Sequence, residues 1–106
     1  MSAPLTPSLI FKAYSAGVFP MAETRESPEV LWFEPPERGI IPLDQFHVPK
    51  RLARTIRTGT YAVRFDTDFP GVIDNCADRG ETWINRSIRE VFCTLHDMGH
   101  AHSVEV

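Results

Sequence analysis

Four side chains that can bind zinc lie close together near the end of the sequence: Cys93, His96, His100 and His102. A zinc site needs three or four such ligands converging on one point. His96 and His100 have the spacing of one helical face, but Gly99 is expected to end the helix between them. The spacing therefore does not predict a metal site, and we expect the histidines to form hydrogen bonds where a helix meets a strand.

Nucleophilic or phosphate-binding chemistry has a weaker basis in the sequence. Cys76 and Cys93 match neither a zinc spacing nor a redox pair, and the sequence places no base beside either thiol. It contains no glycine-rich phosphate loop. We interpret both cysteines as free thiols in a reducing compartment, and we expect no metal and no other cofactor.

Positive charge is concentrated in one stretch, although the net charge of the 106 residues is −3. Residues 23–44 carry six acids and two arginines, whereas residues 45–65 carry five cations and no acid. Four of the five lie on a helix predicted from Pro49 to about Thr58: Lys50, Arg51, Arg54 and Arg57. This stripe predicts contact with nucleic-acid phosphates, and a solvated helix face is the alternative.

The residues before this stripe predict short elements of an α+β fold. Thr6 and Pro7 are typical of a helix start, and Gly17 is typical of its end. Residues 30–33 and 40–43 predict two short strands paired in a hairpin. We expect Trp32 and Phe33 in the core, and Leu52 and Ile56 of the basic helix facing inward.

The residues after Gly59 predict two further strands and two helices. Residues 61–65 alternate as in a half-buried strand, and a helix follows from Phe69 to about Cys76. Asn85 is a plausible N-cap for a helix over 86–98, and residues 100–106 alternate as a strand. The inward stripe of the 86–98 helix is expected to be Ile88, Val91, Phe92 and Leu95.

Several segments resemble, in order and spacing, the leucyl/phenylalanyl-tRNA–protein transferase family, and the last two are the specific ones. They are GVFPM (17–21), LWFEPPERGIIPL (31–43), FHVPKRL (46–52), CADRGETWIN (76–85) and LHDMGHAHSVEV (95–106). The resemblance implies an enzyme that takes leucine, phenylalanine or methionine from an aminoacyl-tRNA. It implies transfer to the α-amino group of a protein that begins with Arg or Lys, which marks that protein for degradation.

The resemblance also assigns residues to an aminoacyl pocket and a tRNA surface. Trp83 matches the tryptophan that lines the family's aminoacyl pocket, and Phe92 stands where some members have a tyrosine. Met21 stands where some members have a tryptophan near the 3′ adenosine of the tRNA, and methionine stacks less well than tryptophan. The helix with Lys50, Arg51, Arg54 and Arg57 fits the patch for the tRNA acceptor arm.

Two domains follow from the same resemblance. Residues 1–58 would form a small N-terminal α/β domain, and residues 59–106 the beginning of an acyl-CoA N-acetyltransferase-like domain. Such a sheet needs more strands than residues 59–106 can form. We therefore expect the catalytic groups that handle the attacking amine beyond Val106, and this piece alone to be inactive.

The remaining patterns concern location and alternatives. The sequence has no apolar run of 18 residues and no secretory signal pattern, so we expect a cytoplasmic protein without a membrane segment. We expect the full-length protein to be a monomer. The alternative hypothesis is a non-catalytic module that binds tRNA or another RNA through its basic helix.

Overall fold

The computed structural model describes residues 4–106 as a mixture of helices and short antiparallel strands. This mixture confirms the predicted α+β class. In chain order the elements are α1 (Pro7–Ser15), β1 (Phe19–Met21), β2 (Leu31–Phe33), the 3₁₀ helix η1 (Leu43–Gln45), α2 (Lys50–Arg57), β3 (Arg64–Phe65), α3 (Phe69–Ala77), α4 (Arg86–Asp97) and β4 (Val104–Glu105).

Short polar side chains begin three of the helices, as their residue types predict. The Thr6 hydroxyl accepts a hydrogen bond from the backbone N–H of Leu9 at 3.1 Å. Asp68 Oδ1 caps α3 in the same way at 3.1 Å from the N–H of Gly71, and Asn85 begins α4. Helix α2 differs slightly, because Pro49 is its N-cap and not its first helical residue.

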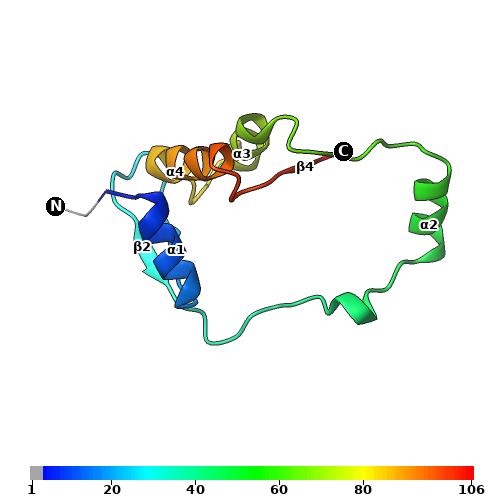
Figure 1. The fold of residues 1–106 in the computed structure, drawn as a ribbon, viewed down its shortest axis with the longest axis horizontal. Helices are drawn as coiled ribbons and strands as arrows, with labels where there is room; N and C mark the ends of the chain where they lie inside the picture. The colour runs from blue at the N-terminus through cyan, green and yellow to red at the C-terminus, as the bar shows by residue number, and fades with distance from the viewer. Residues whose placement is uncertain (1–3) are drawn as a thin grey trace.

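Helix α4 lies at the centre of the packing, against α1 on one side and α3 on the other (Figure 1). Its predicted inward stripe is confirmed, because Ile88, Val91 and Leu95 are buried and Phe92 is partly buried. Two buried clusters meet on this stripe, formed by Ala22, Ala77, Ile84 and Ile88 and by Ile10, Val91 and Leu95. Residues from both ends of the chain therefore share one core.

The predicted hairpin of residues 30–33 with residues 40–43 is wrong. Strand β2 pairs antiparallel with β1, so that Phe19 lies opposite Phe33 and Met21 opposite Leu31. The segment over 40–42 is not a strand, and η1 follows it. Pairing with β1 is available because α1 ends at Gly17, whose φ of 79° turns the chain back toward the core.

The predicted core positions of Trp32 and Phe33 are also wrong, since these side chains are 40% and 41% exposed. The reason is that only β1 of this two-stranded ribbon is buried against the core, so both faces of β2 stay exposed. Pro20 in the middle of β1 is almost fully buried, whereas all three residues of β2 remain exposed.

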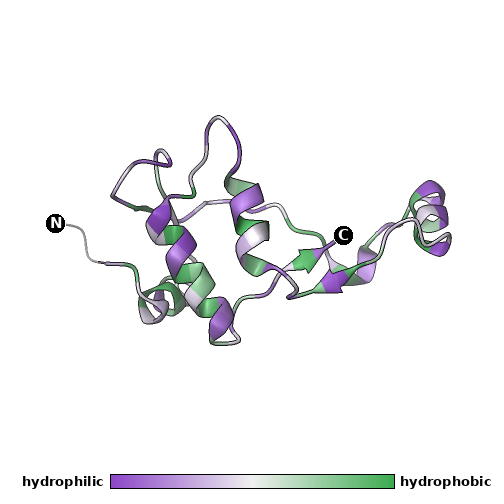
Figure 2. Ribbon diagram, turned by 90° about the horizontal axis from the view of Figure 1, so that it is seen from above, coloured by the Kyte–Doolittle hydropathy of each residue, from purple (hydrophilic) through white to green (hydrophobic). Residues whose placement is uncertain are grey.

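Residues 34–63 leave the core as a long excursion that carries η1 and α2. Helix α2 stands apart from the other helices in both ribbon views (Figures 1 and 2). The prediction that Leu52 and Ile56 face inward is wrong, because they are 43% and 64% exposed. No element of the described residues covers the apolar side of this helix closely enough to bury it.

The predicted strands at 61–65 and 100–106 are much shorter in the structure. Strand β3 pairs with β4 through Arg64 opposite Glu105 and Phe65 opposite Val104. Phe65 is 69% exposed, so the predicted half-buried strand is wrong in burial as well as in length. A ribbon of two strands, each two residues long, needs a further strand or a helix packed against it to bury an apolar face. The predicted division of the chain after residue 58 stays a prediction.

Candidate functional site

The turn before α4 is held so that it presents Trp83 to the outside. Thr82, Ile84 and Asn85 are buried, whereas Trp83 between them is 43% exposed. The Asn85 side chain uses both of its groups: Oδ1 accepts from the N–H of Ile88 at 2.9 Å, and Nδ2 donates to the carbonyl of Ser27 at 2.9 Å. One asparagine therefore begins the helix and ties the turn to the loop that follows β1.

The structure brings the end of β1, which carries Met21, next to the backbone of Trp83. The backbone N–H of Ala22 donates to the carbonyl of Trp83 at 2.9 Å, which joins the end of β1 to the turn. Met21 precedes Ala22 and is half-buried at the end of the β1–β2 ribbon. Two of the three predicted pocket residues thus come from neighbouring backbone segments that are more than sixty positions apart in sequence.

Phe92 occupies a different environment. It packs against both buried clusters, and its ring centroid lies 6.3 Å from that of Tyr14 on α1. Burial raises the pKa of the Tyr14 hydroxyl. Phe92 packs against the cluster that contains Ala22 and Ile84, the sequence neighbours of Met21 and Trp83, so it is a core residue here.

An arginine that sequence analysis did not single out fastens the loop next to Trp83. Arg25 Nη2 donates to the carbonyls of Ala77 at 2.5 Å and Arg79 at 3.2 Å. A cavity of about 380 Å³ lies between the two loops and is lined by residues 23–26 and 79–82. No local signal predicts this contact, because its partners lie more than fifty residues away.

The four cations of α2 form one exposed arc. At 100° per residue, Lys50, Arg51, Arg54 and Arg57 fall on one side of the helix and Leu52 and Ile56 on the other. All four cations are exposed, and no acid among residues 4–106 forms an ion pair with any of them. A surface cavity of about 570 Å³ is lined by these cations together with Val48 and Ala53. This arrangement suits several anionic groups along a path, such as phosphates.

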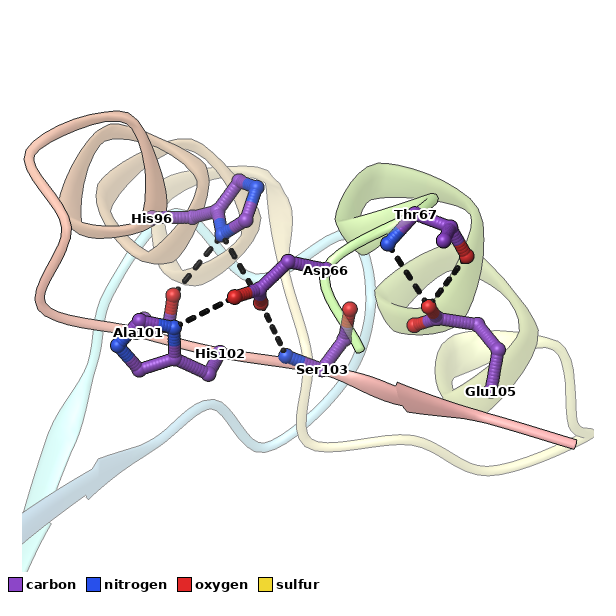
Figure 3. A network of polar contacts seen from close by, with 7 residues as sticks. All are labelled: Asp66, Thr67, His96, Ala101, His102, Ser103 and Glu105. Atoms are coloured by element: carbon purple, nitrogen blue, oxygen red, sulfur yellow. Dashed lines mark hydrogen bonds and ion pairs between the residues drawn. The ribbon is translucent and has the colours of Figure 1, made fainter. Parts of the chain in front are cut away.

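A polar network around Asp66 holds β3, β4 and the end of α4 together (Figure 3). Asp66 has a φ of 57°, a left-handed conformation that aspartate tolerates better than most residues. Its carboxylate accepts from His102 Nδ1 at 2.8 Å and from the backbone N–H of Ser103 at 2.9 Å. His96 Nδ1 lies 3.8 Å from the same carboxylate and 2.9 Å from the carbonyl of Ala101.

The charges in this network favour one another. The hydrogen bond from His102 is the largest of the effects that lower the pKa of Asp66, and the bond from Ser103 adds to it. The same contact with Asp66 raises the pKa of His102. The expectation that the histidines form hydrogen bonds at the helix–strand junction is confirmed for His96 and His102, whereas the ring of His100 packs edge-on against Phe11 at 5.0 Å.

Glu105 extends the network to the start of α3. Its Oε1 accepts from the N–H of Thr67 at 2.9 Å and from the Thr67 hydroxyl at 2.5 Å. Its Oε2 and the Ser103 hydroxyl are buried, and neither has a hydrogen-bond partner among residues 4–106. The pKa of Glu105 is lowered, chiefly by its polar neighbours Ser103 and Thr67.

The cysteine and histidine side chains supply no metal centre within residues 4–106, where no group of three possible ligands converges. Cys76 and Cys93 are free thiols, and burial is the main cause that raises the pKa of Cys93. No helix of the described residues is long and apolar enough to cross a membrane.

Comparison with known families places this arrangement in context. A family model described as leucyl/phenylalanyl-tRNA protein transferase matches residues 40–106, and a model of the N-terminal domain of the same transferases matches residues 3–36. The chain belongs to the leucyl/phenylalanyl-tRNA protein transferase family. The first match contains α2, Trp83 and the Asp66 network, and the second contains α1 and the β1–β2 ribbon.

Individual transferases of this family are about half identical to the chain. The leucyl/phenylalanyl-tRNA–protein transferase of Ruegeria pomeroyi is 53% identical over 102 residues, which are 96% of this chain and 49% of that protein. The transferase of Nitrobacter winogradskyi is 49% identical over 109 residues (99% and 48%), and that of Cereibacter sphaeroides is 52% identical over 102 residues (96% and 48%). The chain thus spans about half the length of the curated relatives it matches.

Proposed function

We propose that this chain is the aminoacyl- and tRNA-binding portion of an aminoacyltransferase. The enzyme would move leucine, phenylalanine or methionine from an aminoacyl-tRNA to proteins that begin with Arg or Lys, and so mark them for degradation in the cytoplasm. The observation that carries the proposal is the exposed Trp83, whose backbone is joined to the end of β1 next to Met21. The two family models, which match residues 3–36 and 40–106, support it.

The main task of the protein in this reaction would be to position the two reactants. The α-amine of the acceptor attacks the ester carbonyl of the aminoacyl-tRNA, a C–N bond forms, and the ester C–O bond breaks to release the ribose hydroxyl. The amine gives up a proton and the leaving oxygen gains one. Because the ester is already activated, holding the two reactants in place can supply most of the rate. We place the groups that move the proton in the part of the relatives that this chain does not span.

Trp83 and Met21 would form one apolar wall for the aminoacyl side chain, with Phe92 behind it. Burial of a leucine side chain contributes about 1.5–3 kcal/mol. An apolar pocket separates similar apolar side chains only about 10- to 200-fold per methylene. Loose selection among Leu, Phe and Met is the expected result, and the four cations of α2 would add affinity common to all charged tRNAs.

We further propose that residues 59–106 begin an acetyltransferase-like domain and that residues 1–58 form the smaller domain before it. The antiparallel pair β3–β4 would then be the first two strands of a larger sheet. A helix packed on the face of such a sheet would cover the exposed Phe65 and Val104. We expect the whole enzyme to act as a monomer.

The test is transfer of labelled amino acid from charged tRNA to a peptide that starts with Arg. The enzyme would be this chain joined to the second half of the Ruegeria pomeroyi transferase, with the intact Ruegeria protein assayed in parallel. We expect transfer with Leu or Phe. Absence of transfer with Leu, Phe and Met from a joined protein that folds would contradict the proposal.

Trp83→Ala tests the pocket, and the chain contains a matched control. Trp32 is the other tryptophan and is similarly exposed, at 40% against 43%. Trp83→Ala should reduce amino-acid transfer far more than it reduces tRNA binding. Trp32→Ala should leave the ratio of transfer to tRNA binding unchanged. Equal effects of the two substitutions on that ratio would remove Trp83 from the pocket.

The α2 arc also supports a second candidate, a module that binds tRNA without catalysis. In that case the chain alone would bind tRNA with a steep salt dependence, and the joined protein would bind tRNA without transferring an amino acid. The transfer assay therefore separates the two candidates.

A further inference from the structure

The β1–β2 ribbon has an inner and an outer face. Pro20 in β1 is almost fully buried and lies opposite Trp32, so this pair marks the face toward the core. Side chains alternate along a strand, which places Phe19, Met21, Leu31 and Phe33 on the opposite face. Leu31 and Phe33 are 44% and 41% exposed. The outer face is therefore apolar, exposed along β2 and half-buried along β1.

The rings of Phe19 and Phe33 and the guanidinium of Arg38 lie next to one another on this face. The rings of Phe19 and Phe33 stack with centroids 6.2 Å apart and an interplanar angle of 29°. The guanidinium carbon of Arg38 lies 6.0 Å from the centroid of Phe19, and one of its nitrogens donates to the carbonyl of Gly17. No acid among residues 4–106 forms an ion pair with Arg38. The cation is thus held beside the rings and keeps unused donors.

Phe33 offers an exposed ring, and the half-buried Phe19 links it to Arg38; an exposed ring next to an arginine is a combination that binds single-stranded nucleic acids. Bases stack on the rings regardless of sequence, and the guanidinium contacts phosphate or a base. The cationic arc of α2 contains no aromatic residue, so α2 and the ribbon offer different parts of an RNA-binding surface. The two lie at opposite ends of the molecule along its longest axis (Figure 1).

We propose that Phe19, Phe33 and Arg38 bind a nucleotide of single-stranded RNA, with its base against the rings and its phosphate at the guanidinium. This inference rests on the proposed function and extends it, because the nucleotide would precede the terminal one at the 3′ end of the tRNA. Met21 continues the same face toward Trp83, so the platform leads directly to the proposed aminoacyl wall.

The local charges determine how this binding should behave. Glu34 and Glu37 are exposed in the same loop as Arg38 and oppose the attraction of phosphate. Stacking must therefore supply most of the affinity at the ribbon, and stacking depends little on salt. The salt dependence of tRNA binding should come from α2, which separates the two surfaces in a binding experiment.

The experiment compares intact tRNA with the same tRNA lacking its last three nucleotides, at one salt concentration. Phe33→Leu keeps the apolar bulk and removes the ring, and Tyr61→Leu is the matched control because Tyr61 is 64% exposed elsewhere. Wild-type chain and Tyr61→Leu should bind intact tRNA about five- to tenfold more tightly than trimmed tRNA. Phe33→Leu should bind the two within about twofold, with an unchanged circular dichroism spectrum.

The inference is overturned if trimming does not weaken binding by the wild-type chain, or if Phe33→Leu and Tyr61→Leu respond to trimming alike. Failure of intact tRNA to bind at any salt concentration would contradict the proposed function instead.

The ribbon is then tested separately, by adding a trinucleotide that contains the fluorescent base 2-aminopurine to the chain. Quenching by the wild-type chain that is lost in Phe33→Leu supports the platform, and equal signals overturn it.

Discussion

The charge on α2 allows a quantitative prediction for tRNA binding. Lys50, Arg51, Arg54 and Arg57 are exposed on one arc and unpaired with any acid of residues 4–106. If all four neutralise a phosphate, the slope of log affinity against log salt is about −3.6, taking about −0.9 per contact. A rise from about 50 to 200 mM salt then weakens binding roughly 150-fold.

Arg54→Ala combined with Arg57→Ala should halve this slope, to about −1.8, so that the same change in salt weakens binding only about 12-fold. The matched control is Arg86→Ala combined with Arg89→Ala on α4. It removes the same formal charge, but Arg86 pairs with Glu90 and Arg89 with Asp74. The control should leave the slope near −3.6.

Filter binding or fluorescence anisotropy at four or more salt concentrations measures both slopes. An equal decrease in the two double variants would mean that overall charge, and not the α2 arc, controls binding. An unchanged slope after the Arg54 and Arg57 substitutions would exclude α2 from the RNA contact.

Three further predictions concern stability of the chain, measured by unfolding followed by circular dichroism. Asn85→Ala should lower the free energy of unfolding by about 2 kcal/mol, because a helix cap and the hydrogen bond to Ser27 are lost together. Asp68→Ala loses only a cap and should lower it by about 1 kcal/mol. Equal losses would contradict the hydrogen bond to Ser27. Ile88→Ala should lower the free energy of unfolding by about 2–5 kcal/mol, since Ile88 is fully buried in the cluster with Ala22, Ala77 and Ile84, and a loss below about 1 kcal/mol would contradict that packing. The Asp66–His102 pair should stabilise most between pH 3.8 and 6.5, the ordinary pKa values of the two groups. The lowered pKa of Asp66 means that its contribution is lost as the pH falls below that window, and the raised pKa of His102 means loss as the pH rises above it. The difference in melting temperature between wild type and His102→Ala should follow this profile, which His96 and Glu105 near the carboxylate modulate; a flat difference from pH 4 to 9 would refute it.

Helix boundaries were predictable because the groups that set them are adjacent in sequence. Thr6, Asp68 and Asn85 each cap an N–H three residues ahead, and Gly99 ends α4 with a φ of 84°. The buried stripe of α4 followed from the same local periodicity. Interactions of this kind are complete within one turn of helix and need no partner elsewhere in the chain.

Strand partners and burial were predicted less well, because they depend on what lies opposite. The apolar stretch that contains Trp32 was predicted to pair with residues 40–43, which follow it closely in sequence, whereas the folded chain pairs it with β1. Leu52 and Ile56 have the spacing of an inward face, but spacing does not provide the surface that covers it.

For the candidate site, the residue types alone indicated a cationic helix, and the family motif gave Trp83 its proposed role. The tertiary structure decided that the end of β1 joins the turn with Trp83, that Phe92 packs against the buried clusters, and that Arg25 fastens the neighbouring loop. It also decided that Asp66 joins His102 and Ser103 across more than thirty residues. Hydrogen bonds between distant segments depend on how the helices pack, and a local pattern carries no record of that packing.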